Sequence, residues 1–245
     1  MQLLKQCISA EWLKLRHSHL WAVLLALPVV SALIGCANFS INRGALSHEW
    51  YSLWSQVGLF YAEFFLPTLI AICCAYLCRL EHLNKNWNTI MTAPVPASGI
   101  FAAKLAVAGM LMAGVQALMF VLYYIGGKVI GLVSPLPPEL FGWLLRGWLA
   151  AVAICSLQLA LSLRIRSFAA PVGIGLCAAF AGLGMYVLKA GLLFPHSLLT
   201  IGMGVLSQTS LSFRDQLLFC IMSLLYAAAF GGWAIYRLRT SDVTA

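Results

Sequence analysis

The chain has 245 residues, of which 62% are hydrophobic and only 9% are charged. Soluble domains carry about 25% charged residues, so this composition excludes an ordinary soluble protein and indicates an integral membrane protein. The formal charge of +8 does not indicate a nucleic-acid-binding protein, because the basic residues stand at the ends of apolar segments rather than in one cluster.

Six segments are long and apolar enough to span a membrane, since a spanning helix needs about 20 predominantly apolar residues. They leave no room for a soluble catalytic domain, so we expect one all-α transmembrane domain over residues 1–245. The expected spans are Leu20–Asn38, Val57–Cys78, Ile100–Ile125, Gly142–Leu163, Ala169–Leu188 and Leu217–Tyr236.

The distribution of Lys and Arg predicts the orientation of the chain. With the N-terminus in the cytoplasm, twice as many basic residues fall inside as outside, the sense required by the positive-inside rule. An even number of spans then places both termini in the cytoplasm. The inside set is Lys5, Lys14, Arg16, Arg79, Lys85, Lys104, Arg164, Arg166, Arg237 and Arg239, and the outside set is Arg43, Lys128, Arg146, Lys189 and Arg214.

Residues 1–18 have apolar side chains at helical spacing, with charged residues between them. This pattern favours an amphipathic helix in the membrane interface, with Trp12 at headgroup depth, over a polar tail.

Farther on, Leu33-Ile-Gly-Cys36 resembles a lipoprotein cleavage box. Five more spans follow it, so we favour an uncleaved first span. The eight Cys residues mostly lie within spans and show no CxxC pair, so a disulfide framework is not expected.

The loop expected at 39–56 contains Trp50, Tyr51 and Trp54, which is typical of an aromatic belt at the membrane surface. In the next span, Pro67 should kink the helix. Glu63 is the one acidic residue inside a predicted span, and charges in the bilayer generally mark cavities or partners.

Three polar side chains inside the spans are candidates for a substrate path. Glu63 either lines a cavity or gate for a cationic substrate, or reaches the outer interface or pairs with Arg146. Gln116 and Gln158 either donate hydrogen bonds between helices or line the same path.

Residues 79–96 form a polar island of about 18 residues between two apolar runs, with mixed charge, amides and a Trp. Such a segment belongs in water at a membrane surface.

By contrast, residues 189–214 are mostly apolar but are interrupted by Pro195, Gly202 and Gly204. We expect a broken, re-entrant or interfacial helical segment on the external side, shielded by the rest of the protein. The loop at 164–168 is short enough to make spans four and five an antiparallel hairpin.

Small residues are frequent in spans five and six, where they allow close approach of helices. They indicate either a subunit or gating interface or ordinary packing within the bundle. They are Gly173, Gly175, Ala178, Ala179, Gly182 and Gly184, together with Ala227, Ala228, Gly231 and Gly232.

The sequence contains no G-x-x-x-x-G-K-[ST] phosphate loop, so if ATP powers this protein, another chain binds it. No sequence motif combines a nucleophile with a base, and His17 and His19 lack a third metal ligand nearby. We therefore expect no catalytic residue, cofactor or metal on this chain. An enzyme remains possible only if groups far apart in sequence converge.

Three stretches resemble a known family. They are Glu11-Trp-Leu-Lys-Leu15; Phe65-Leu-Pro67 running into Glu81-His-Leu-Asn-Lys-Asn-Trp-Asn88 and Pro94-Val-Pro96, with Lys104; and Leu157-Gln158 with Leu161-Ser-Leu-Arg164, Ser167-Phe168 and Pro171-Val-Gly-Ile-Gly175. Together with the order of the parts, they resemble the membrane subunit of a type 2 ABC exporter, closest to the lantibiotic-immunity permeases. The second stretch is typical of the superfamily and the third is more specific to the immunity group.

The resemblance implies a permease in the bacterial cytoplasmic membrane that expels a lantibiotic-type antimicrobial peptide for self-immunity. It implies a second permease subunit, identical or homologous, and a dimer of ABC ATPase subunits that bind ATP and Mg. It assigns 79–96 as the cytoplasmic coupling segment, with a set of contact residues for the ATPase in which Trp87 is a packed anchor and the charges set the register. That set is Glu81, His82, Asn84, Lys85, Trp87 and Asn88.

Two alternatives stay open. One is a type 2 ABC exporter of another amphiphile, such as a drug, lipid or polysaccharide. The other is a membrane protein that is no transporter, such as an assembly factor or an intramembrane hydrolase.

Overall fold

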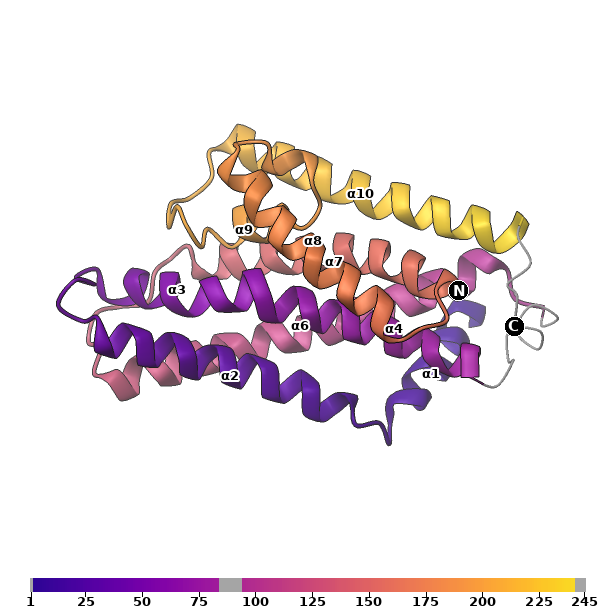
Figure 1. The fold of residues 1–245 in the computed structure, drawn as a ribbon, viewed down its shortest axis with the longest axis horizontal. Helices are drawn as coiled ribbons and strands as arrows, with labels where there is room; N and C mark the ends of the chain where they lie inside the picture. The colour runs from indigo at the N-terminus through magenta and orange to yellow at the C-terminus, as the bar shows by residue number, and fades with distance from the viewer. Residues whose placement is uncertain (1, 84–93, 241–245) are drawn as a thin grey trace.

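The computed structural model of the chain describes residues 2–83 and 94–240, and every regular element in this part is helical. Six helical stretches are long and apolar enough to cross a membrane, which confirms the predicted all-α membrane fold. They run roughly along the long axis of the molecule (Figure 1). The elements are α1 (Gln2–Leu15), α2 (Leu20–Ile41), α3 (Glu49–Phe60), η1 (Tyr61–Phe65), α4 (Leu66–Leu83), α6 (Ala97–Ile130), α7 (Leu140–Arg164), α8 (Ala169–Val187), η2 (Gly191–Leu193), α9 (Ser197–Gly202) and α10 (Phe213–Thr240).

The second span begins earlier than predicted. Helices α3 and α4 are joined through η1 into one stretch of 35 residues, Glu49–Leu83. Trp50 and Trp54 lie in this stretch with 1% and 0% of their surface exposed, so the interpretation of 39–56 as a loop with an interfacial aromatic belt is wrong.

The two indole rings are buried because other aromatic rings and backbone acceptors surround them. The ring of Trp54 stacks on that of Trp143 with centroids 5.4 Å apart, and Tyr123 packs edge-on at 5.2 Å. The Trp54 indole N–H donates to the carbonyl of Met203 at 2.9 Å, and that of Trp50 donates to the carbonyl of Ser134 at 2.8 Å. Both polar groups are thus satisfied inside the protein, as buried Trp requires.

A π-helical turn, η1, interrupts the long second span just before Pro67. Proline has no N–H to donate to the carbonyl four residues earlier, which here belongs to Glu63. At the next carbonyl, that of Phe64, the hydroxyl of Thr68 donates a hydrogen bond of 2.6 Å. The disturbance expected at Pro67 therefore takes the form of a wider turn, of a kind that often occurs at functional sites.

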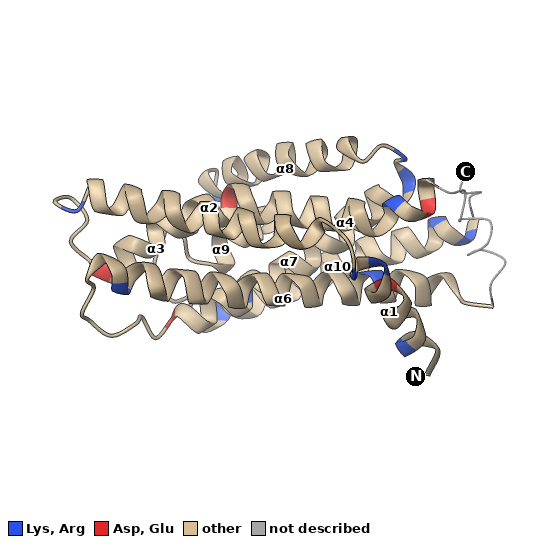
Figure 2. Ribbon diagram, turned by 90° about the horizontal axis from the view of Figure 1, so that it is seen from below, with Lys and Arg blue, Asp and Glu red and all other residues tan. Residues whose placement is uncertain are grey.

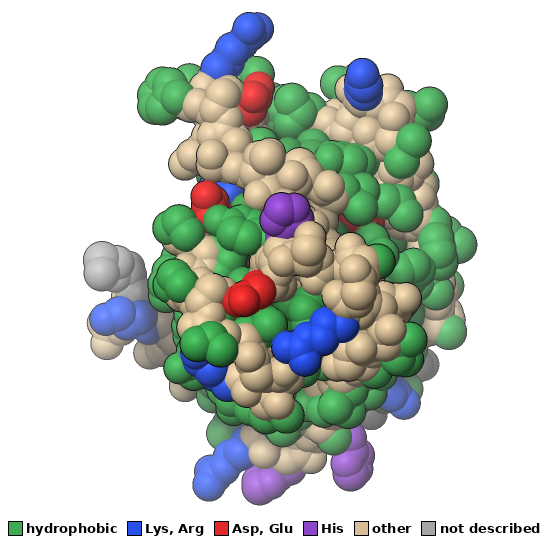
Figure 3. All heavy atoms as spheres, turned by 90° about the vertical axis from the view of Figure 1, so that its left-hand side faces the viewer, with side chains coloured by type: hydrophobic (Ala, Val, Ile, Leu, Met, Phe, Trp, Pro, Cys, Tyr) green, Lys and Arg blue, Asp and Glu red, His purple; other side chains and the backbone are tan. Residues whose placement is uncertain are grey.

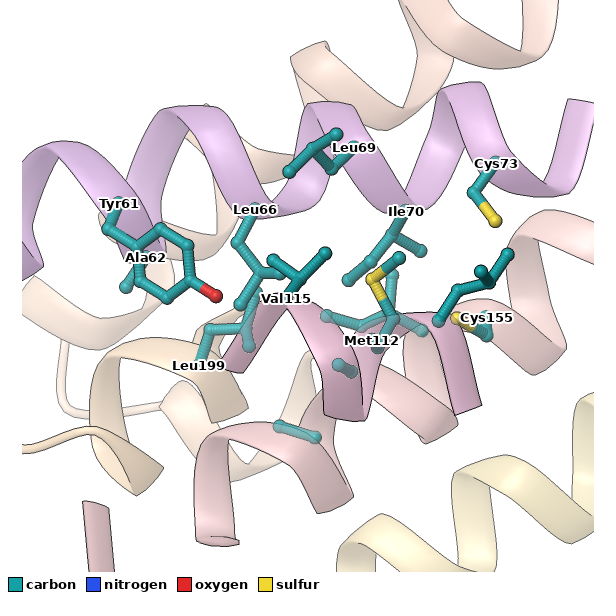
Figure 4. Packing of buried hydrophobic residues seen from close by; sticks show 14 of the residues in the cluster. Tyr61, Ala62, Leu66, Leu69, Ile70, Cys73, Met112, Val115, Cys155 and Leu199 are labelled. Atoms are coloured by element: carbon teal, nitrogen blue, oxygen red, sulfur yellow. The ribbon is translucent and has the colours of Figure 1, made fainter. Parts of the chain in front are cut away.

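The hydrophobic core runs along the middle of the bundle and centres on α4. Figure 4 shows Leu66, Ile70 and Cys73 of this helix facing Met112 and Val115 of α6, with Cys155 of α7 and Leu199 of α9 close by. Helices α8 and α10 lie at the outside, and only 22% of their most apolar windows is buried. Their exposed apolar faces are left for lipid or a partner subunit.

The segment between α8 and α10 is broken, as the sequence predicts. It contains the short helices η2 and α9, and Leu198, Leu199 and Thr200 of α9 are almost fully buried. Gly204 follows with a φ of +58°, a conformation that glycine adopts without strain. Figure 1 shows α9 beside α7 and α8 near the end of the bundle away from α1. Protein therefore shields this irregular backbone, as a re-entrant segment requires.

The two ends of the bundle differ in charge. Helix α1 and the C-terminal end of α10 lie at one end, here called the terminal end, and Figure 2 shows basic residues gathered there. The opposite end, which faces the viewer in Figure 3, carries isolated charged side chains separated by hydrophobic and uncharged ones.

Several of the small residues in α8 and α10 pack within this chain. A methyl group on Gly182 would lie 2.8 Å from His196, and one on Gly231 would lie 3.1 Å from the ring of Phe101. The side chain of Gln158 likewise leaves no room for a methyl group on Gly175. Ordinary packing therefore accounts for these three glycines, whereas Gly173, Gly184 and Gly232 have no atom within 4 Å of such a methyl group and lie on open faces.

Candidate functional site

Four charged side chains meet at the terminal end of the bundle, where α1, α4 and α6 come together. Lys104 Nζ lies 2.7 Å from Glu81 Oε1 and 3.1 Å from Glu11 Oε2, and it donates to the carbonyl of Leu77 at 2.6 Å. Lys14 Nζ lies 2.8 Å from Glu11 Oε1 and 2.6 Å from Glu81 Oε1. We call Glu11, Lys14, Glu81 and Lys104 the ion cluster.

The ion cluster is almost fully removed from solvent. The side chains of Lys104 and Glu81 are 0% and 1% exposed, whereas that of Lys14 is 29% exposed. Two acids face two bases, so the formal charges cancel. Because an unpaired buried charge is costly, this balance is a condition for packing the three helices together. The cluster therefore joins the surface helix α1 to the ends of two spans.

The ion cluster includes Glu81 from the start of the predicted coupling segment and Lys104 from just beyond its end. Glu81 lies in the last turn of α4 and Lys104 in the second turn of α6. The carboxylate of Glu81 is turned into the bundle rather than toward a partner surface, and His82 Nε2 lies 2.8 Å from the carbonyl of Ser162. Asn84, Lys85, Trp87 and Asn88 lie outside the described residues, so their role stays a prediction.

Glu63 lies in the π-turn and is buried, with 4% of its surface exposed. Its carboxylate accepts a hydrogen bond of 2.6 Å from the hydroxyl of Thr200 on α9. The burial of Glu63 contradicts the alternative in which it reaches the outer interface, and it is bonded to Thr200, whereas Arg146 donates to the carbonyl of Gly202 at 3.0 Å rather than pairing with it. A contact between Glu63 and substrate stays a prediction.

The two glutamines differ in their hydrogen bonding. Gln116 accepts a hydrogen bond of 3.2 Å from the hydroxyl of Tyr61 on a neighbouring span, so it acts between helices as an acceptor rather than the expected donor. Within the described part of the chain, the Gln116 side-chain NH₂ and both polar atoms of Gln158 have no partner. Buried amide groups that lack partners attract water or the polar groups of a ligand. The prediction that they line a substrate path remains open.

Besides its buried leucines, helix α9 is held in the bundle by polar contacts. Besides the bond from Thr200 to Glu63, Ser197 donates to the carbonyl of Gly182 at 2.7 Å. The indole of Trp54 and the guanidinium of Arg146 bind carbonyls at and after its C-terminal end. Four other elements thus hold one short segment.

His196, just before α9, gives this region a pH dependence that can be measured. Burial lowers the pKa of His196 from 6.5 to about 4. Between these two values the unfolded chain binds the proton more tightly, so the stability that is fully present above pH 6.5 is lost as the pH falls toward 4. We expect the free energy of unfolding in detergent to drop by about 2 kcal/mol between pH 7.5 and pH 5 through this group.

The variant His196→Leu should lose this part of the pH dependence, as followed by thermal unfolding at the two pH values. The matched control is His17→Leu, at an exposed histidine, which should keep the parental behaviour. Equal pH dependence in His196→Leu and the parent would contradict the assignment.

No group of three or more His, Cys, Asp or Glu side chains within residues 2–83 and 94–240 is arranged to hold a metal ion. All eight Cys residues are free thiols.

Six apolar helices, a charged N-terminal helix tied to two of them and a broken helical segment before the last span define a multi-pass membrane protein. The family model described as ABC-2 family transporter protein matches residues 7–182, and the chain belongs to this family. It is therefore the membrane-spanning permease subunit of an ABC exporter, and the family implies an ABC ATPase partner. No curated protein matches the chain.

The match covers the whole ion cluster together with Glu63, Gln116 and Gln158, and it ends before α9. The partners that Glu11, Lys14, Glu63 and Lys104 make in the fold were not predicted from the sequence. One signal was available for Lys104. It lies within a predicted span of a chain that has only seven acidic residues, so few partners were possible.

Proposed function

We propose that this permease is driven by a separate ATPase that docks on residues 79–96. The observation that carries the proposal is the position of the ion cluster. Glu81 and Lys104 lie on the two sides of the segment 84–93 along the chain, and they meet in space with Glu11 of α1. When the segment 84–93 moves, the ion cluster makes α4, α6 and α1 move together.

We further propose that the substrate is a lantibiotic-type antimicrobial peptide. Its support is the resemblance of residues 157–175 to the immunity permeases. The proposed assembly has two permease subunits, identical or homologous, and two ATPase subunits that bind ATP and Mg. Export of another amphiphile is the second candidate, because the exposed apolar faces of α8 and α10 suit any amphiphile that travels along the membrane. Membership of a transporter family disfavours a non-transport assembly factor.

The test is the variant Trp87→Ala in a sensitive host that makes the complete transporter. Loss of a packed aromatic anchor costs at least about 2 kcal/mol, or about 30-fold in affinity. We therefore expect the ATPase to co-purify poorly with this variant, and the host to lose protection against a lantibiotic-type peptide.

The control is Asn86→Ala, which changes the same segment outside the predicted contact set and should leave both readouts unchanged. Normal co-purification and protection in Trp87→Ala would show that the ATPase does not use this anchor. If the parental transporter protects against a drug or detergent-like amphiphile but not against the peptide, the peptide assignment fails while the coupling assignment stands.

The proposed orientation places the terminal end in the cytoplasm. Nine of the described Lys and Arg residues lie at this end, and the positive-inside rule then sets the side. On a Cys-free background, Ser167→Cys should react with a membrane-impermeant maleimide only after lysis, and Val133→Cys, at a side chain 87% exposed, should react in intact cells. The reverse labelling pattern would overturn the orientation.

A further inference from the structure

Helix α8 lies at the margin of the bundle (Figure 2) and is buried along one narrow stripe. The buried residues follow one another at helical spacing, so they share one face of the helix. They are Pro171, Gly175, Ala179 and Gly182. None of these side chains can donate or accept a hydrogen bond, so the stripe offers only apolar contact to the groups beneath it.

The groups beneath the first half of the stripe are polar. Gln158 of α7 is 0% exposed, and a methyl group on Gly175 would lie 2.4 Å from its Nε2. Both polar atoms of Gln158 lack a hydrogen-bond partner in the described part of the chain. One turn along α7, Ser162 is 1% exposed, and its Oγ lacks a partner there as well. Ser162 and Pro171 border one narrow gap at the start of α8.

Polar groups also lie beneath the second half of the stripe. His196 packs against Gly182 and is 4% exposed, and both of its ring nitrogens lack a partner among the described residues. The turn η1, which carries Glu63, also packs against α8, where the rings of Phe64 and Phe180 meet edge-on with centroids 5.4 Å apart. We call these four buried side chains the polar row: Ser162, Gln158, Glu63 and His196.

Three members of the polar row destabilise this conformation. A buried polar group without a partner has lost its hydrogen bonds to water and gained none in the protein. At Gln158, the backbone of α8 itself occupies the place of a partner, because Gly175 packs directly on the amide. A conformation in which α8 moves away would therefore regain these hydrogen bonds.

Helix α8 is suited to such a movement. Only 22% of its most apolar window is buried. One hydrogen bond of 2.7 Å, from the hydroxyl of Ser197 to the carbonyl of Gly182, ties its far end to α9. The contact with α7 at Gly175 adds no hydrogen bond, since the amide of Gln158 has no partner. Moving α8 away from α7 at this point thus breaks apolar contacts and frees polar groups.

We propose that α8 is a movable cover over a path inside one permease subunit, and that the polar row binds the polar part of the transported amphiphile when α8 moves away from α7. The amide, hydroxyl and imidazole can each donate and accept hydrogen bonds, and Glu63 adds an acceptor for a cationic group. The path therefore suits a polar part that is uncharged or cationic. The inference rests on the export function, but it does not depend on which amphiphile is exported or where the ATPase docks.

The first test uses the variant Gln158→Met/Ser162→Ala, which removes the polar atoms and nearly keeps the size of both side chains. We expect the purified chain to unfold about 2–4 °C higher, because two buried groups without partners are gone. Transport of a lantibiotic-type peptide should become about tenfold slower, because the open path loses hydrogen bonds to its contents. A purely structural role would not change stability and transport in opposite directions.

The matched control is Ser156→Ala. Ser156 lies on the same helix and is also 0% exposed, but its hydroxyl donates to the carbonyl of Ala227 at 2.8 Å. The control should unfold at a lower temperature and transport at the parental rate. A lower unfolding temperature in Gln158→Met/Ser162→Ala would overturn the proposal, because the two groups would then stabilise the closed conformation. A parental transport rate in this variant would also overturn it.

The second test asks whether water reaches the polar row, and it needs no substrate. On a Cys-free background, Ser162→Cys in the complete transporter should react with a small methanethiosulfonate reagent about tenfold faster during ATP turnover, because reactivity follows the population of the open form. Val133→Cys, at a side chain 87% exposed, should react equally fast with and without ATP.

Equal rates for Ser162→Cys with and without ATP would contradict a movable cover. If ATP accelerates this labelling but the parental transporter does not export the peptide, the peptide assignment fails while the cover over the polar row is supported.

Discussion

Replacing Lys104 by Met should destabilise the protein by about 3–5 kcal/mol and abolish ATP-driven transport. Lys104 is completely buried and has Glu11, Glu81 and the carbonyl of Leu77 as partners. Without it, the partly exposed Lys14 is left to balance two buried carboxylates. The measurements are the free energy of unfolding in detergent and the protection of a sensitive host.

A second variant separates stability from coupling. Lys104→Met combined with Glu81→Leu restores neutrality and replaces the buried pair by apolar side chains, a change that is often neutral for stability. We expect the double variant to recover most of the lost stability while transport stays absent, because α4 and α6 no longer move with α1. Lys5→Met, at an exposed position on α1, is the control and should behave like the parent.

The prediction about Lys104 is contradicted if the single variant keeps the parental unfolding free energy. Recovery of transport in the double variant would show that the ion cluster stabilises the fold but does not transmit motion.

Trp54→Ala should cost about 3–5 kcal/mol of stability, the range for deleting a large buried aromatic side chain. Trp54 is fully buried between the rings of Tyr123 and Trp143, and its indole N–H binds the carbonyl of Met203 just after α9. The variant should therefore both open a cavity and loosen α9. Thermal unfolding and limited proteolysis between α8 and α10 would report the two effects.

The variant Trp54→Phe separates the loss of ring packing from the loss of the hydrogen bond to Met203. It keeps most of the ring packing but leaves the Met203 carbonyl without its donor, so we expect a cost of about 1–3 kcal/mol. Trp233→Ala on α10, where the indole is 40% exposed, is the matched control and should change stability much less. A parental unfolding temperature in Trp54→Ala would contradict the buried position of this ring.

The number of spans, the short loop at 164–168 and the broken segment at 189–214 follow from composition and breaker residues alone. The early start of the second span does not. Residues 52–56 are too polar for a span by hydropathy, yet their polar groups form hydrogen bonds inside the protein. Ser55 donates to the carbonyl of Ser52 at 2.8 Å, and Gln56 accepts a bond of 2.6 Å from Asn38 on α2. This second contact depends on tertiary structure.

The ion cluster could not be predicted from the sequence for a related reason. Lys104 fits the charge bias of the positive-inside rule, so its charge has an explanation from the sequence alone. Its partners lie 93 and 23 residues away, and no helical or strand periodicity connects such separations. The pairing becomes evident only when α1 is seen to pack against α6.

The long-range pairing of α1 also bears on how the chain enters the membrane. Gln2–Leu15 is made before its partners, because Lys14 pairs with a residue 67 positions later and Glu11 pairs with Lys104, 93 positions later. Helix α1 therefore cannot complete its ion pairs until α4 and the start of α6 have been made. A chain that placed either span upside down would leave Lys104 or Glu81 across the bilayer from its counterion, at a high energetic cost. The pairing thus favours correctly inserted chains before any partner subunit arrives.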